Sequence, residues 1–156
     1  MIQAVAIALG IAGFSTAAMA CPDYRQSGET YHLSGTDLYA PHSFDVIAGG
    51  NHSIERCHIP LQTDRGDGYV AQTPDFTFSL SRMGSYRLEI SARSDCDTVL
   101  LVNTSQANWY YDDDDGGDLD PKITLTRPSD GWLDVWVGTY GPSTCRATLQ
   151  METFHR

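Results

Sequence analysis

Six aspartates lie within nine residues of one segment, from Asp112 to Asp120. Two unit charges about 6 Å apart repel by about 0.7 kcal/mol in bulk water, and by several times more near a protein surface. Folding draws these carboxylates together, so the segment either extends into solvent or recruits a cation. Carboxylates interleaved with glycines, here Gly116 and Gly117, suit Ca²⁺, which takes about six to eight oxygen ligands from a tightly bending backbone. The segment therefore predicts a calcium site, with a solvated acidic turn as the alternative.

The candidate ligands of this calcium site are Asp112, Asp113, Asp114, Asp118 and Asp120. Side chains alternate along an extended chain, so Asp112 and Asp114 point one way and Asp113 points the other. Not all of them can therefore bind the same ion. The spacing differs from an EF-hand, because Ile123 stands at the twelfth position, where that motif requires a glutamate. Magnesium fits less well, since it prefers few carboxylates and several retained waters.

Catalytic motifs are missing from the sequence. The acidic segment resembles the Gly-Asp-Ser-Gly-Gly motif of trypsin-like peptidases, but Asp115 stands where the nucleophilic serine would be. The chain has no Gly-x-Ser-x-Gly elbow and no His-Glu-x-x-His motif. Its paired carboxylates give no reason for one of them to hold the raised pKa that glycoside hydrolysis needs. We predict no catalytic residues, with a small secreted hydrolase as the alternative.

An aromatic group falls near the carboxyl end of the chain. On a strand over residues 131–140, Trp132, Trp136 and Tyr140 share one face with Asp134, and the opposite face is aliphatic. The aliphatic face predicts the core. The aromatic face is either covered by the amino-terminal half or exposed as a platform on which sugars stack.

The first twenty residues have the pattern of a signal peptide. Residues 5–14 are apolar, and Ala18-Met19-Ala20 matches the small-x-small cleavage pattern. The apolar run is shorter than the ~20 residues needed to cross a bilayer, so we expect no membrane insertion after cleavage. The sequence predicts a secreted or periplasmic protein. Its net charge of −10 repels nucleic-acid phosphates and leaves no basic patch to bind them.

Four cysteines remain in the mature chain: Cys21, Cys57, Cys96 and Cys145. An even count in an exported chain predicts two disulfides. Three pairings are open. We favour Cys21–Cys57 with Cys96–Cys145, because Cys96 precedes one strand-like run and Cys145 begins another.

Short alternating runs between turn residues predict an all-β fold, an antiparallel, jelly-roll-like β-sandwich. Strands are expected over residues 43–48, 76–80, 86–90, 98–103, 109–112, 122–126, 131–140 and 145–154. Residues 21–156 are long enough for one domain with a sizeable core. Within it, residues 21–68 read as an irregular part that covers the sandwich, and residues 69–156 as the core.

The carboxyl-terminal half resembles a known family. Asp97–Asn103, then Asp112–Asp114 with Gly116-Gly117, and then Trp136–Tyr140 follow the order of motifs in the bacterial pre-peptidase C-terminal domain. The resemblance covers about the last seventy residues. The first half is similar to an extension found on exported stand-alone bacterial versions.

This resemblance implies a small β-sandwich with an accessory role, since the family is usually appended to secreted peptidases and other hydrolases. Asp112, Asp113 and Asp114 match the acidic turn of the family, whereas Asp118 and Asp120 stand where neutral residues are common. No catalytic domain accompanies this sequence. The predicted function is therefore a non-enzymatic, calcium-stabilised exported binding module, whose partner is an exported protein or a polysaccharide. A carbohydrate-binding module is a further alternative.

Overall fold

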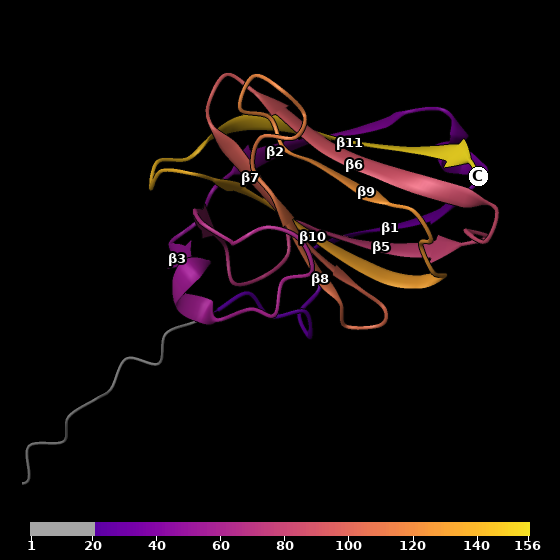
Figure 1. The fold of residues 1–156 in the computed structure, drawn as a ribbon, viewed down its shortest axis with the longest axis horizontal. Coiled ribbons are helices and arrows are strands. Elements are labelled where there is room, and N and C mark those ends of the chain that lie inside the picture. The colour runs from indigo at the N-terminus through magenta and orange to yellow at the C-terminus, as the bar shows by residue number, and fades with distance from the viewer. Residues whose placement is uncertain (1–20) are drawn as a thin grey trace, which may run out of the picture.

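The computed structural model describes residues 21–156, so the predicted signal peptide, residues 1–20, lies outside the described part. Two β-sheets pack face to face around a hydrophobic core (Figure 1). Cys21 is bonded to Cys57 and Cys96 to Cys145, with Cα–Cα distances of 5.6 and 6.6 Å. The predicted all-β sandwich with two disulfides is confirmed, including the favoured pairing.

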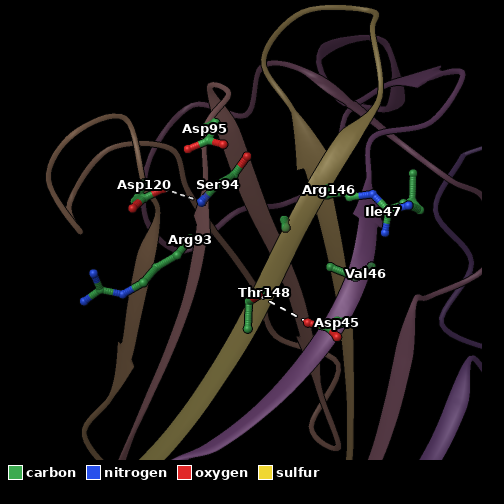
Figure 2. A pocket seen from close by; sticks show the side chains of 10 residues that line it. Asp45, Val46, Ile47, Arg93, Ser94, Asp95, Asp120, Arg146 and Thr148 are labelled. Carbon is green, nitrogen blue, oxygen red and sulfur yellow. Dashed lines mark hydrogen bonds between the residues drawn. The ribbon is translucent and has the colours of Figure 1, made fainter.

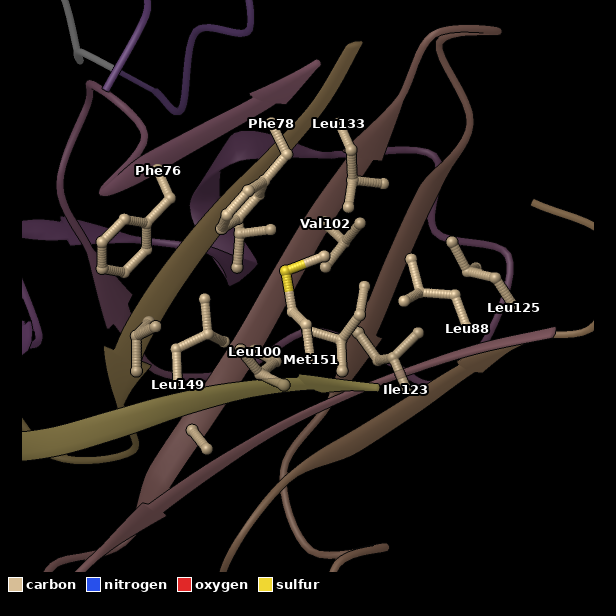
Figure 3. Close-up of a cluster of buried hydrophobic side chains, with 14 of the residues drawn as sticks. Phe76, Phe78, Leu88, Leu100, Val102, Ile123, Leu125, Leu133, Leu149 and Met151 are labelled. Atoms are coloured by element: carbon tan, nitrogen blue, oxygen red, sulfur yellow. The ribbon is translucent and has the colours of Figure 1, made fainter. Parts of the chain in front are cut away.

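Sheet B has four antiparallel strands in the order β2-β11-β6-β9. Their bounds are β2 (His42–Ala48), β11 (Cys145–His155), β6 (Tyr86–Ser94) and β9 (Lys122–Leu125). Burial alternates along β6 and β11, as the period of two in a strand dictates when one face meets the core and the other meets solvent. Leu149 and Met151, for example, point into the core shown in Figure 3.

Sheet A has seven strands, with β10 at its centre. They are β1 (Glu29–Ser34), β5 (Phe76–Ser81), β10 (Gly131–Thr139), β7 (Thr98–Thr104), β8 (Trp109–Asp112), β4 (Tyr69–Val70) and β3 (His52–Ser53). Strand β10 pairs with β5, β7 and β4, and β7 pairs with β8. Short 3₁₀ turns, η1 (Asp37–Tyr39) and η2 (Glu55–Cys57), lie in the connections.

Strand β1 pairs with β5 in parallel, so the expectation of a wholly antiparallel sandwich is wrong at this edge. Parallel neighbours need a crossover connection. Here the chain leaves β1, forms β2 in sheet B, and returns through β3 and β4 before it reaches β5. Residues 21–68 are thus more regular than predicted, because they contribute strands to both sheets.

The core between the sheets contains aromatic and aliphatic side chains from both, among them Phe78, Leu100 and Met151 (Figure 3). A second, smaller cluster lies on the other face of sheet A. Its buried members are Ile54, Val70, Val99, Leu101, Trp109, Tyr111 and Trp136. Because this cluster covers the outer face, β7 and most of β10 are buried on both sides. Full burial of such a side chain contributes about 1.5–3 kcal/mol.

A candidate metal site at the acidic loop

Asp112 closes the acidic loop at its base. It ends β8, and its side chain is 3% exposed. Its Oδ2 atom accepts hydrogen bonds from the backbone N–H groups of Asp115 at 3.0 Å and Lys122 at 2.7 Å. Aspartates commonly fix turns in this way, by accepting from a backbone group a few residues on. One carboxylate oxygen therefore joins the start of the loop to the first residue of β9.

The carboxylates of Asp64, Asp112 and Asp115 converge at this base. Each offers an oxygen that lies within 4.8 Å of the others. Asp112 is buried, while Asp64 and Asp115 are exposed. Among the described residues, none donates a hydrogen bond to Oδ1 of Asp112, so this oxygen is free to face a cation.

Asp64 reaches the loop because its segment runs alongside β8. Leu61 forms a parallel bridge with Trp109, and the Gln62 N–H donates to the Trp109 carbonyl at 2.8 Å. The Thr63 hydroxyl donates to the Tyr111 carbonyl at 2.5 Å and accepts from the Tyr111 N–H at 2.9 Å. With Thr63 held beside Tyr111, the next residue stands beside Asp112.

The structure brings together a different set of carboxylates from the predicted one. Of the five predicted ligands only Asp112 belongs to the cluster. Asp120 accepts a hydrogen bond from the Ser94 N–H at 3.2 Å. Asp118 lies at the exposed tip of a turn, where it and Leu119 have left-handed φ angles of 56° and 65°. The Asp120 N–H donates to the Gly117 carbonyl at 3.0 Å and closes this turn.

Asp113 and Asp114 also lie outside the cluster. Burial raises the pKa of Asp113, and the neighbouring charge of Asp114 adds to the shift. The chain leaves the extended conformation after Asp112, so the alternation expected for Asp112–Asp114 does not continue into the loop.

The electrostatics at Asp112 favour a cation. Burial raises its pKa to about 6, and the charges of Asp115 and Asp113 add to this, while the N–H groups of Lys122 and Asp115 oppose it. An ion between the carboxylates would reverse the repulsion among them. The donor set consists of oxygen ligands alone, which fits a hard cation such as Ca²⁺.

The aromatic residues of β10 do not form one exposed platform. Trp136 is fully buried, because the segments that precede β5 cover it. Its ring lies 5.3 Å from that of Trp109, and its Nε1 donates to the Gln72 carbonyl at 3.4 Å. Trp132 and Tyr140, at the two ends of the strand, are 53% and 47% exposed. The strand pattern placed all three on one face but could not show which of them would be covered.

A hollow of about 760 Å³ lies over β2, β6 and β11 on the solvent face of sheet B (Figure 2). Its lining contains no histidine to serve as a base. The Ser94 hydroxyl lies 3.1 Å and 3.2 Å from the sulfur atoms of Cys96 and Cys145. Arg93 and Arg146 extend in opposite directions in Figure 2, so they do not converge on one anion. This hollow therefore lacks the nucleophile–base pair of a serine hydrolase.

None of the helical turns in residues 21–156 has the length and apolar character needed to cross a membrane. No protein-family model matches the chain, and no curated protein matches it.

Solved structures with a similar fold do exist. The pre-peptidase C-terminal domain of a collagenase from Bacillus anthracis has 11% identity and a TM-score of 0.44, over 83% of this chain and 98% of that one. PliG, a periplasmic inhibitor of g-type lysozyme from Aeromonas hydrophila, has 8% identity and a TM-score of 0.47, over 82% and 100%. CorA, a surface-associated copper-binding protein of Methylomicrobium album BG8, has 10% identity and a TM-score of 0.41, over 84% and 100%.

The family that the sequence resembles is thus among these structural neighbours. At such low identities and TM-scores, the activities of the three proteins carry no conclusion about this chain.

Proposed function

We propose that this chain is a non-enzymatic exported binding module, a single domain over residues 21–156 whose fold is stabilised by Ca²⁺ at Asp64, Asp112 and Asp115. The observation that supports the metal is the convergence of three carboxylates from two distant segments, one of them buried. Two disulfides fit the oxidising compartment of an exported protein. The partner is an exported protein or a polysaccharide.

Calcium at this position would link two parts of the chain by binding carboxylates from both. Asp64 belongs to the amino-terminal part, while Asp112 and Asp115 belong to the β8–β9 loop. Carbonyl groups and water would complete the coordination, as is usual for Ca²⁺. An ion that binds only the folded state stabilises it by about 2.7 kcal/mol at a hundredfold excess over its Kd.

The test is thermal unfolding of the purified protein in millimolar Ca²⁺ and in EGTA. We expect calcium to raise Tm by about 4 °C or more, the range that a gain of 1–3 kcal/mol gives for a domain of this size. Asp64→Asn and Asp115→Asn should each abolish most of the shift. Asp118→Asn is the matched control: it removes an equal charge from the tip of the same loop and should keep the shift.

Identical melting curves in Ca²⁺ and EGTA would show that the loop is a solvated acidic turn. Loss of the shift in Asp118→Asn but not in Asp64→Asn would place the ion at the tip, nearer to the set predicted from the sequence. The non-enzymatic part is tested separately, with the purified protein on casein and on glycans. Hydrolysis that copurifies with the chain would favour a small secreted hydrolase.

A further inference from the structure

A second buried carboxylate, that of Asp134, lies on the outer face of sheet A. Asp134 pairs in register with Thr77 on β5 and with Asn103 on β7, so the three polar side chains form a row across adjacent strands. They are 6%, 3% and 2% exposed. Their neighbours along β10, Leu133 and Val135, face the core. The row is therefore buried on the side of the sheet where a solvent-facing residue would be expected.

A hollow of about 320 Å³ lies above this row, and we call it the Trp132 hollow. It is lined by Tyr24, Ser27, Thr77, Asn103, Thr104, Ser105, Ala107, Trp132 and Asp134. The amino-terminal side of the hollow, formed by Tyr24 and Ser27, is attached to β5 by Gly28, whose N–H donates to the Thr77 hydroxyl at 3.0 Å. Only glycine fits there, because a Cβ atom would lie 2.3 Å from the Pro74 carbonyl oxygen.

Most polar groups at the floor of the Trp132 hollow are already bonded within the protein. The Thr77 hydroxyl donates to Oδ1 of Asp134 at 2.7 Å. With its amide oriented to satisfy both groups, Asn103 accepts from Trp109 Nε1 at 3.1 Å and donates to the Thr104 carbonyl at 3.2 Å. The Thr104 hydroxyl accepts from the Asn108 N–H at 3.3 Å. These groups have little capacity left for a ligand.

Oδ2 of Asp134 is the exception. Among the described residues, no group donates a hydrogen bond to this oxygen, and no Lys, Arg or His forms an ion pair with the carboxylate. The ion pairs within residues 21–156 lie elsewhere and join Arg25 to Asp23, Arg65 to Glu55 and Arg87 to Glu89. Burial raises the pKa of Asp134, and the Thr77 hydroxyl opposes the rise. A buried carboxylate without a cationic partner costs stability. A hydrogen-bond donor with a positive charge would satisfy this oxygen.

The walls of the hollow suit the same ligand. Trp132 is 53% exposed and Tyr24 is 47% exposed, two of the few large aromatic side chains that face solvent. The face of an aromatic ring attracts a cation within about 6 Å and packs against its aliphatic stem. The net charge of −10 also attracts basic partners over a longer range.

We propose that the Trp132 hollow binds the positively charged side chain, lysine or arginine, of a basic protein partner. Oδ2 of Asp134 accepts from the ammonium or guanidinium group, and Trp132 and Tyr24 pack against its stem. This inference rests on the binding-module proposal and names the chemistry of the partner; it does not depend on the calcium site.

The experiment follows the indole N–H signals of the purified protein by NMR during titration with three blocked tripeptides, Gly-Arg-Gly, Gly-Lys-Gly and Gly-citrulline-Gly. Citrulline has the shape of arginine without its charge. We expect the Trp132 signal to shift on addition of the arginine and lysine peptides, which bind with millimolar affinity. The protein should bind the citrulline peptide at least about tenfold more weakly. The buried Trp136 signal should move little.

Two variants with matched controls assign the contacts. Asp134→Asn keeps the acceptor for Thr77 and should weaken binding at least about tenfold. Its control is Asp45→Asn, because Asp45 accepts from Thr148 across the strands of sheet B in the same way, at 3.4 Å, but is exposed. Trp132→Ala removes its own indole signal, so binding to this variant is followed by the indole signal of Trp109, whose Nε1 donates to Asn103 at the floor of the hollow. This variant should bind about fivefold more weakly, whereas Tyr140→Ala, at the other end of β10, should bind unchanged.

Equal binding of the arginine and citrulline peptides, or unchanged binding by Asp134→Asn, would overturn the proposal. A Trp132 signal that responds to neutral oligosaccharides and not to the cationic peptides would instead make the hollow a sugar site. Each titration is run in Ca²⁺ and in EGTA. The titrations therefore test cation binding in the hollow, and the melting curves separately test calcium binding at Asp64, Asp112 and Asp115.

Discussion

The outer faces of the two sheets differ, although both sheets belong to one sandwich. Along β6 and β11 of sheet B, buried and exposed residues alternate, because the outer face meets water. Along β7 and β10 of sheet A, nearly every residue is buried. The difference arises from residues 21–68 and the connections beside them, which cover the outer face of sheet A around Trp109 and Trp136.

This difference explains where the two candidate binding sites lie. The carboxylate cluster forms where Asp64 runs beside the edge of β8, and the Trp132 hollow forms where Tyr24 and Ser27 lie over β5, β10 and β7. Both sites need the covering segment, because it removes a carboxylate from water. The bare face of sheet B has charged residues too, but solvent screens them. A covered sheet can therefore hold sites that a bare sheet cannot.

The largest expected effect separates two tryptophans on one face of β10. Trp136→Ala should lower the free energy of unfolding by about 4 kcal/mol, since Trp136 is fully buried against Trp109. Trp132→Ala should change it by less than about 0.5 kcal/mol, because Trp132 is half exposed. Urea unfolding followed by circular dichroism measures both. Similar losses in the two variants would show that the cover does not protect Trp136 as described.

A smaller effect is expected when the Cys21–Cys57 disulfide, which lies in the segment covering sheet A, is removed. Replacing Cys21 and Cys57 by serine should cost about 3 kcal/mol, because a disulfide that closes a loop of tens of residues restricts the unfolded chain. Hydrogen exchange should then rise around Trp109 and Trp136 while β6 and β11 stay protected. The matched control replaces Cys96 and Cys145, which tie the β6–β7 connection to β11. Uniformly faster exchange in both sheets would mean that cover and sandwich open as one unit.

The smallest of these effects concerns pH. Asp75 accepts from the Val137 N–H at 2.7 Å, and burial raises its pKa to about 7. Between about pH 4 and pH 7 the folded carboxyl holds more protons than the unfolded one, so the free energy of unfolding falls as pH rises through this window.

Asp75→Asn keeps the acceptor and should remove most of that fall. Unfolding measured near pH 4.5 and pH 8 tests this, with Asp45→Asn, exposed on sheet B, as the control. An unchanged pH dependence in Asp75→Asn would contradict the assignment.

Sequence patterns gave the sandwich itself because strand periodicity is local. The predicted runs at residues 43–48, 76–80, 98–103 and 145–154 all fall within strands of the structure. Strand β1 was missed. Only part of its residues face the core, and its parallel pairing with β5 depends on a crossover that no local pattern encodes.

The site was less predictable than the fold. The acidic loop was visible as a charge run, and Asp112 was named, but Asp64 entered the cluster through the pairing of Thr63 with Tyr111, far along the chain. Asp120 instead accepts from the Ser94 N–H at the end of β6, another contact between distant segments. Likewise, the pattern put Trp132 and Trp136 on one face without showing what lay over it. Contacts between distant segments decided each of these outcomes.

The place of β11 has a consequence for when the protein can fold. Although it is formed by residues 145–155, β11 is an inner strand of sheet B and pairs with both β2 and β6. Until these residues are available, β2 and β6 each lack their shared neighbour and the core between the sheets stays open. A chain emerging from a ribosome or through a translocation pore must therefore remain unfolded until almost all of it has passed. This delay keeps the chain unfolded, which is the form that can pass through a narrow pore.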